Sequence, residues 1–328
     1  MKSGNDSVFV SLQRQQLRTQ VAERLSRLDD TTYYADRERR LSYRPLDTRW
    51  LYNDLPLLNR PGPAMQQVWG ASNVGLYTLP SGVGAGPAVW CHEHLPDYHA
   101  FRGSYGGYAF PLYDRRPGQN PVNLSPALLF GLSTTYGTLV PPEDAFDAIL
   151  ALLSATTYTL RFAEDLEDVF PHVPFPADPA VFARAVTVGR DIRAVETFAR
   201  APAALDTTSQ LTTPPTPGPL AVVDWDEGRL VLRDDDTGVL SGIPEAVWSL
   251  SISGYRVLPR WLAAREGQPV DLTLVAAARD VAARIAELLE LFARADTVLV
   301  DALANTLRRD LLGIGLVPGQ NDDDDESD

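Results

Sequence analysis

Prolines and glycines interrupt residues 41–113 so often that this part of the chain can form only short elements of secondary structure. Between these interruptions lie the apolar runs WLY, GLYTL, AVWCHEH and GYAFPLY, in which aromatic and β-branched side chains recur. Proline cannot donate a hydrogen bond to a sheet, and glycine weakens the interior of a strand, so both residue types tend to end strands. The pattern therefore predicts a region of short strands.

Apolar side chains recur at helical spacing farther along the chain, in residues 145–153, 158–166 and 181–195. Residues 141–144, in which two prolines are followed by Glu and Asp, carry the signals of a helix start. Residues 169–176 contain three prolines and are expected to be non-helical. Gly189 is expected to break the last of the three helices.

The C-terminal part alternates between a polar segment and further regular structure. Residues 201–219 are rich in proline and threonine and lack periodicity, so we expect a solvated linker. The following sequence predicts a β-hairpin that turns at residues 226–228, then a helical turn and a short helix within residues 242–267. Residues 274–292 repeat apolar side chains over several turns, which predicts a long helix that packs on this core or on a partner.

These segments together predict an α+β protein in which a mixed short-strand region is followed by helices, then by a hairpin and C-terminal helices. Residues 8–10 and 17–28 add an expected strand and an amphipathic helix near the N-terminus. The boundaries that we expect are residues 1–40 for a linking strand and helix, 41–200 for an α+β domain, 201–219 for the linker, 220–312 for the hairpin and helical part, and 313–328 for a disordered acidic tail.

The chain is strongly acidic, with a formal net charge of −14 over 328 residues. Six acidic side chains lie in residues 322–328, so the remainder carries about −8. Lys2 is the sole lysine, and the other basic residues behind this charge are arginines. Because DNA affinity comes mainly from Lys and Arg contacts with phosphates, this charge argues against tight non-specific binding of a duplex by the chain alone.

Three further features bound the class and the location of the protein. No run of about 18 apolar residues is present, so no membrane-spanning helix is expected. The N-terminal sequence MKSGNDSVFVSLQRQQ lacks an apolar core segment, so no secretory signal is expected. Cys91 is the one cysteine, which rules out an internal disulfide and fits a reducing cytoplasm.

A group of cations and aromatic rings gathers in residues 41–64, LSYRPLDTRWLYNDLPLLNRPGPA. Its members are Arg44, Arg49 and Arg60 with Tyr43, Trp50 and Tyr52. Guanidinium groups suit phosphate oxygens and the edge of guanine, and aromatic rings suit bases. A structural role is also open, in which Arg44 and Arg49 pair with Asp47 and nearby carboxylates while the rings fill the core.

Residues 43–52, YRPLDTRWLY, resemble the YRPFDTRW(I/L)Y signature of Type ISP restriction-modification enzymes and related large adenine methyltransferases. Other short matches follow in the family's order: NRPGPAM at 59–65, NVGLYTL at 73–79, YAFPLY at 108–113, NLSP at 123–126, LSATTYTLRFAEDL at 153–166, VPFPAD at 173–178, GIPEAVW at 242–248 and SGYRVLPRWLAAREG at 253–267. Each match alone is weak, but together they cover most of the chain. Leu46 stands where the family has Phe, and Gly62 replaces the second arginine of an RPR segment, which weakens the case for DNA binding at that point.

The resemblance implies a fold like that of a target-recognition domain and the role of a C-terminal specificity region, which reads a DNA sequence. It implies double-stranded DNA as a partner, together with a methyltransferase or a helicase–nuclease subunit of a restriction or phage-defence system. Phosphate contacts would position such a module, and a few polar side chains would specify bases. The candidate DNA-binding residues are Arg44, Arg49, Arg60, Gln66, Gln67, Asn73, Arg102, Ser104, Tyr105, Arg115 and Arg116.

The catalytic motifs of that family are absent from the sequence. It contains no (D/N)PPY tetrapeptide for holding a flipped adenine, no P-loop, no GxGxxG after a predicted strand and no GxSxG elbow. We therefore expect a non-catalytic module with no cofactor and no metal.

Two other classes of protein stay open. The acidic charge would suit an interaction protein or DNA mimic that docks on a methyltransferase or nuclease. A metal-dependent hydrolase is the second alternative, since His92 and His94 would share one face of a strand close to two further ligands. The four possible metal ligands are Cys91, His92, His94 and His99.

Overall fold

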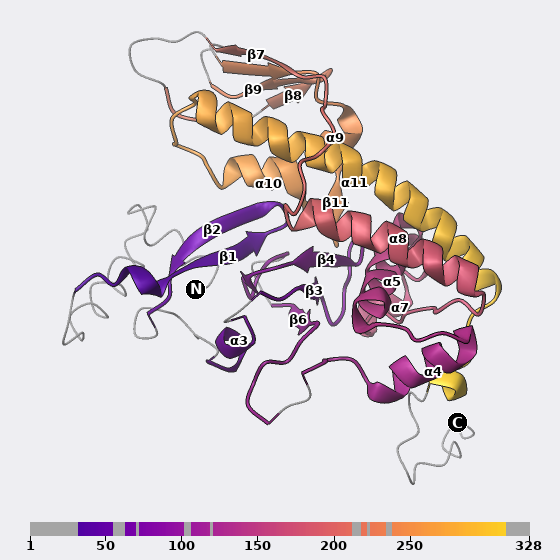
Figure 1. Cartoon of the computed structure of the whole chain (residues 1–328). Coiled ribbons are helices and arrows are strands. Elements are labelled where there is room, and N and C mark those ends of the chain that lie inside the picture. The colour runs from indigo at the N-terminus through magenta and orange to yellow at the C-terminus, as the bar shows by residue number, and fades with distance from the viewer. Residues whose placement is uncertain are drawn as a thin grey trace, which may run out of the picture.

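The computed structural model describes residues 32–54, 63–69, 72–101, 106–118, 121–211, 218–221, 224–233 and 238–312. Within these ranges the strands form four small sheets, and helices of very different lengths pack around them (Figure 1). This mixture confirms the predicted α+β class. The strand expected at residues 8–10, the helix expected at 17–28 and the tail expected at 313–328 lie outside the described residues.

Two of the sheets come from the region of short strands. In the first, β1 (Glu38–Arg44) pairs antiparallel with β2 (Asp47–Tyr52) and parallel with β5 (Leu95–Pro96). In the second, β3 (Gly75–Thr78) lies between β4 (Val89–His92) and β6 (Tyr108–Pro111). The prediction of short strands is therefore confirmed here, and a short helix, α3 (Pro63–Val68), lies between β2 and β3 in the sequence.

The turn between β1 and β2 holds a strained residue. Leu46 has a φ of 55°, a left-handed conformation that costs a non-glycine residue about 1–2 kcal/mol. Its side chain is buried in the main hydrophobic core, whereas Leu41, Tyr43 and Leu51 of the hairpin form a small cluster of their own. Burial of Leu46 therefore holds the tip of the hairpin against the body of the protein.

The middle of the chain is helical, as the apolar spacing predicted. It contains α4 (Pro126–Tyr136), α5 (Pro142–Ser154), α6 (Thr156–Arg161), α7 (Asp165–Asp168) and α8 (Pro179–Glu196). α5 begins at the predicted proline and acidic start, and no helix includes the proline-rich residues 169–176.

Two expectations about these helices are wrong. Residues 158–166 do not form one helix, because residues 162–164 form a turn between α6 and α7. Within α7, the carbonyl of Leu166 accepts a hydrogen bond from Gly82 N at 2.7 Å. Gly189 does not break α8, which continues through it. The missing side chain instead permits close packing, since a Cβ at Gly189 would lie 1.7 Å from the carbonyl oxygen of Asp147 in α5.

The C-terminal part contains an antiparallel sheet of order β7–β10–β9–β8. Its strands are β7 (Thr208–Leu211), β8 (Asp224–Asp226), β9 (Arg229–Val231) and β10 (Gly238–Ser241). The β8–β9 turn lies where the sequence predicted it, with positive φ at Glu227 and Gly228, as a two-residue hairpin turn requires. β7 corrects the expectation for residues 201–219, because part of that segment forms an edge strand rather than a solvated linker.

The remaining elements follow this sheet, and they include the predicted helical turn, short helix and long helix. They are α9 (Glu245–Ser249), β11 (Ser251–Ile252), β12 (Tyr255–Arg256), α10 (Val257–Ala263) and α11 (Leu272–Ala304), with short 3₁₀ helices at Ala35–Arg37 and Arg309–Leu312. α11 begins at Asp271, whose side chain accepts a hydrogen bond from Leu274 N at 2.8 Å. It is longer than predicted, runs alongside α8 (Figure 1) and also contacts α5.

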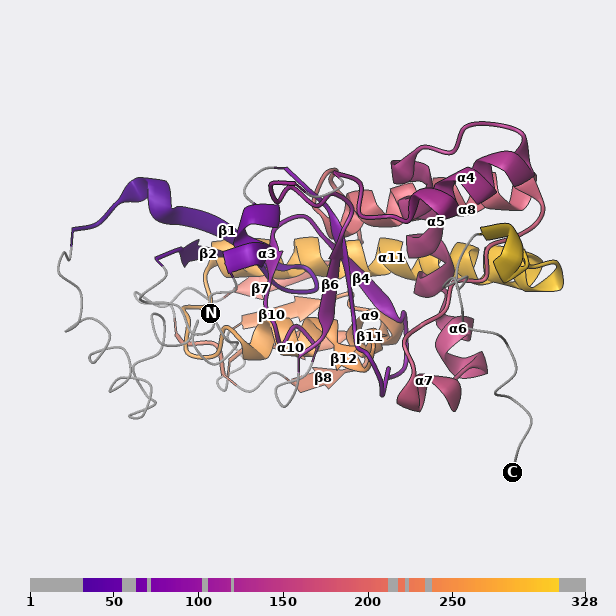
Figure 2. The same cartoon turned by 90° about the horizontal axis from the view of Figure 1, so that it is seen from below.

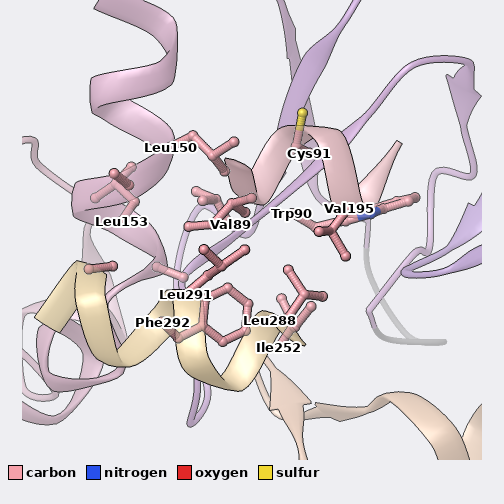
Figure 3. Packing of buried hydrophobic residues seen from close by; sticks show 14 of the residues in the cluster. Val89, Trp90, Cys91, Leu150, Leu153, Val195, Ile252, Leu288, Leu291 and Phe292 are labelled. Atoms are coloured by element: carbon pink, nitrogen blue, oxygen red, sulfur yellow. The ribbon is translucent and has the colours of Figure 1, made fainter. Parts of the chain in front are cut away.

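One hydrophobic core joins the N-terminal strands, the middle helices and α11. Figure 3 shows Val89 of β4, Leu150 of α5, Val195 of α8 and Phe292 of α11 within this cluster. Each such side chain contributes about 1.5–3 kcal/mol when fully buried, so α11 stabilises both the strands and the helices. None of the helices in the described part of the chain has the length and apolar character needed to cross a membrane.

Candidate nucleic-acid interface

The two arginines of the YRPLDTRW signature point into the protein. Arg44 is buried, lies 3.2 Å from a carboxylate oxygen of Asp97, and donates a hydrogen bond to the carbonyl of Tyr43 at 2.6 Å. The guanidinium carbons of Arg44 and Arg49 each lie 4.0 Å from the centre of the Tyr43 ring. These arginines therefore brace the hairpin, and a buried guanidinium such as that of Arg44 is not presented to a DNA groove.

Asp47 joins the signature to a distant helix. Its carboxylate accepts from Arg49 Nη2 at 2.9 Å and from Arg265 of the α10 C-terminal segment at 2.7 Å and 3.2 Å. The Arg265 guanidinium also stacks on Trp261, at 3.5 Å from the ring centre. The structural interpretation of Arg49 is thus confirmed, while Arg44 pairs with Asp97 rather than with Asp47.

Asn73 also has a structural environment. Its Nδ2 donates to the carbonyls of Val68 at 3.2 Å and Tyr113 at 2.8 Å, and its Oδ1 accepts from the backbone N–H groups of Val74 and Tyr113. The side chain is buried and connects the end of α3 to the segment after β6. The amide is therefore fully engaged within the protein.

The other described candidates lie nearer to solvent. Gln67 of α3 is exposed, and Gln66 beside it is half-buried. Arg115 donates to a backbone carbonyl, and Arg116 pairs with Asp114, its Nε lying 2.9 Å from a carboxylate oxygen. These side chains can reach an external partner, although both arginines already have contacts.

Four candidates cannot be placed. Arg60, Arg102, Ser104 and Tyr105 lie outside the described residues, so their roles stay predictions. Next to the last three, the N–H of Gly107 donates to the hydroxyl of Tyr77 at 2.7 Å, and a Cβ on this glycine would lie 2.5 Å from that ring. Glycine is needed here because the backbone passes directly over a buried tyrosine.

A group of exposed side chains on β1 and β2 was not among the predicted site residues. Arg39, Arg40 and Trp50, here called the cationic ridge, are all exposed, and the ring of Trp50 is 61% exposed. The guanidinium carbon of Arg40 lies 4.0 Å from the centre of that ring. In the described residues, neither arginine of the ridge has a carboxylate within ion-pair distance. The sequence signal was the run RERR at residues 37–40, which stands out in an acidic chain.

Arg40 and His94 separate two hollows beside the cationic ridge. The smaller one, of about 100 Å³, is lined by residues of β1, β2, β5 and α3 and by their neighbours. Figure 2 shows α3 beside β1 and β2. The larger one, of about 380 Å³, extends toward α10 and α11, and acidic side chains such as Asp47, Glu93 and Asp280 line it together with Arg40. The smaller hollow is therefore the one with a cationic bias.

The proposed metal ligands lie in different environments. The His92 ring is stacked between Trp69 and Trp90, at 5.2 Å and 5.3 Å between ring centres, and burial lowers its pKa to about 4. β4 ends at His92, so His94 does not share a strand face with it. In the ranges that the structure describes, no three His, Cys, Asp or Glu side chains are grouped so that they could hold a metal. The set Cys91, His92, His94 and His99 therefore does not form a metal site in this structure.

Comparison with protein families and solved structures agrees with the family resemblance found in the sequence. The sequence model of the family described as "Type ISP C-terminal specificity domain" matches residues 6–291. No curated protein matches the sequence closely enough to count as a relative.

Three solved structures share the fold. The first is the ATP-dependent Type ISP restriction-modification enzyme LlaBIII bound to DNA, with a TM-score of 0.64 and 16% identity over 89% of this chain and 21% of that chain. The second is a nuclease-deletion mutant of the Type ISP restriction-modification enzyme LlaGI in complex with a DNA substrate mimic, with a TM-score of 0.60 and 16% identity over 81% of this chain and 21% of that chain. The third is a DrdV–DNA complex, with a TM-score of 0.61 and 22% identity over 90% of this chain and 30% of that chain. The chain thus spans less than a third of the length of each of these proteins.

Proposed function

The chain belongs to the family of Type ISP C-terminal specificity domains, and from this premise we propose that it selects a DNA sequence while other domains carry out modification and cleavage. The observation that carries the proposal is the family match over residues 6–291, which includes the signature hairpin and most of α11. The absence of catalytic motifs from the sequence is consistent with a non-catalytic module.

Positioning and base reading would be done by different side chains. The cationic ridge supplies guanidinium charge that no carboxylate of the described residues neutralises, and it can therefore contact phosphates, which fix the register of a protein on a duplex. Exposed Gln67, together with Arg60, Arg102, Ser104 and Tyr105, then supplies candidates for base contacts, because amide and guanidinium groups match base edges. The internal hydrogen bonds of Arg44, Arg49 and Asn73, together with the burial of Arg44 and Asn73, support bracing roles for these three residues.

The proposed partners are a methyltransferase and a helicase–nuclease. A methyltransferase would flip and methylate an adenine, and a helicase–nuclease would cleave unmodified DNA, as parts of a restriction system that protects the cytoplasm from phage. With a net charge of −14, the chain would leave many of the phosphate contacts to such partners. Its own contribution would be the choice of sequence.

A selection from randomised duplexes tests the proposal. The chain is used alone and together with a Type ISP methyltransferase polypeptide, and bound DNA is sequenced at several salt concentrations. We expect weak binding by the chain alone, about micromolar or weaker at physiological salt, and a defined sequence preference in the complex. Tight binding without sequence preference would contradict the proposal, and so would a stable complex with the methyltransferase that excludes DNA, since that result indicates a DNA mimic.

A further inference from the structure

The smaller hollow beside the cationic ridge has the dimensions of a site for one small group. Its volume of about 100 Å³ is roughly that of three water molecules, which is enough for a phosphate group and too small for a base pair. Leu51 and Leu95 form apolar walls. The polar and aromatic lining consists of Arg39, Arg40, Asn53, Gln66, Trp69 and His94.

Hydrogen-bond donors dominate this lining. Arg39 uses its Nη1 for the carbonyls of Asp36 and Glu38, at 2.6 Å and 2.9 Å, and Arg40 stacks on Trp50. In the described residues no acidic side chain neutralises either guanidinium. Nearby arginines differ, since Arg37 lies 2.7 Å from a carboxylate oxygen of Asp54.

Two polar atoms around the hollow are buried and have no hydrogen-bond partner among the described residues. They are Nε1 of Trp69 and Oδ1 of Asn53, and both residues line the hollow. An indole N–H can only donate, so its missing partner must be an acceptor. The amide of Asn53 can rotate to present its NH₂ group in place of the oxygen. An unsatisfied buried donor costs about 1–3 kcal/mol, which an accepting ligand would relieve.

Two charged side chains, those of Arg40 and Glu93, face His94. Burial lowers the pKa of His94, and the positive charge of Arg40 lowers it further. Glu93, whose carboxylate lies 3.3 Å from His94 Nε2, lines the larger hollow and not this one. The smaller hollow is therefore a positive, donor-rich recess with no carboxylate among its lining residues.

We propose that this recess, formed by Arg39, Arg40 and Trp69 with their polar neighbours, binds one phosphate group of the DNA backbone. The inference rests on the proposed function, and it assigns to this recess the task of holding the duplex in register rather than reading bases. Guanidinium groups suit this task because they bind phosphate oxygens in bidentate geometry. The backbone is the favoured source of the phosphate because Arg39 and Arg40, which line the recess, are both exposed on the surface, where a long polymer can reach them.

The double variant R39Q/R40Q tests the inference on the duplex selected above and on a scrambled duplex. Losing one phosphate contact should reduce the slope of log K against log salt by about 0.9 and weaken binding of both duplexes about tenfold at low salt, with the ratio between them unchanged. R37Q is the matched control, because Arg37 is close in sequence and already paired with Asp54. We expect it to leave the slope unchanged, and both variants to unfold at the wild-type temperature.

Replacing single backbone phosphates of the selected duplex by neutral methylphosphonates identifies the ligand. One position should weaken the wild type and leave R39Q/R40Q unaffected. Inorganic phosphate at matched ionic strength should compete no better than chloride, and strong competition would overturn the backbone assignment in favour of a free phosphate. Unchanged binding, or a changed sequence preference with an unchanged slope, would also overturn the inference while the specificity function stands. If the wild type binds no duplex even with the methyltransferase, both proposals fail.

Discussion

Replacing Asp47 by Asn should destabilise the protein by about 3 kcal/mol. The side chain of Asp47 is 1% exposed, and its two partners, Arg49 and Arg265, are 20% and 16% exposed. Removing one partner of a fully buried ion pair costs about 3–5 kcal/mol, because the other charge is left without compensation. Since both guanidinium groups keep some contact with water, the lower end of this range applies.

The effect can be measured by urea unfolding, followed by tryptophan fluorescence, and by calorimetry, in which a loss of this size appears as several degrees in Tm. D54N provides the control, because the Arg37–Asp54 pair flanks the open end of the same hairpin and Arg37 is 40% exposed, so a much smaller change is expected. A double-mutant cycle of D47N with R265Q should give a coupling of about 1–2 kcal/mol. If D47N unfolds like D54N, or if the two substitutions are additive, Asp47 does not join the hairpin to α10.

Three further predictions concern the core. G189A should destabilise the protein by about 3 kcal/mol or more in urea unfolding, because its Cβ would overlap the Asp147 carbonyl. The control, T187A on the exposed face of α8, should have almost no effect on stability. Equal effects of the two substitutions would refute the close packing of α5 and α8. Y77F removes a hydroxyl that donates to one carbonyl and accepts from two backbone N–H groups, and it should cost about 1–3 kcal/mol and speed hydrogen exchange at Gly107; unchanged exchange would contradict this role. Burial raises the pKa of Glu196 from its ordinary 4.5 to about 8, so the folded state binds the proton more tightly and stability should fall as pH rises from about 4.5 to 8. The unfolding free energy of E196Q should match that of the wild type at pH 5 and exceed it at pH 9 by up to about 5 kcal/mol. Parallel pH profiles of the two proteins would refute this.

Local signals in the sequence were enough for most of the secondary structure. The proline and acidic start of α5, the hairpin turn at Glu227 and Gly228 and the prolines of residues 169–176 each act within a few neighbours, so they can be interpreted from the chain alone. Gly189 shows where such signals fail. Its helix propensity suggested a break, but contact with another helix required the absence of a side chain.

The candidate site also has features that the sequence showed and features that only the fold showed. The cluster of arginines and rings was visible in the sequence, but the partners of those arginines were not, because ion pairing depends on residues far apart in the chain. Asp47 and Arg265 lie 218 positions apart, and Arg44 is paired with Asp97. Arg39 and Arg40, just before the signature, have no such carboxylate in the described residues, and this difference is the basis for proposing that they contact DNA phosphates.

The sequence by itself therefore determined the family, the α+β class and the approximate positions of α5, α8, the β8–β9 hairpin and α11, since these depend on short-range periodicity and on motifs in a fixed order. It did not indicate α3, β5 or β7. Only the tertiary structure decided which arginines are internal braces and which are free to meet a phosphate. The physical reason is that a guanidinium group is neutralised by whichever carboxylate the fold brings within about 4 Å, and no local pattern records that distance.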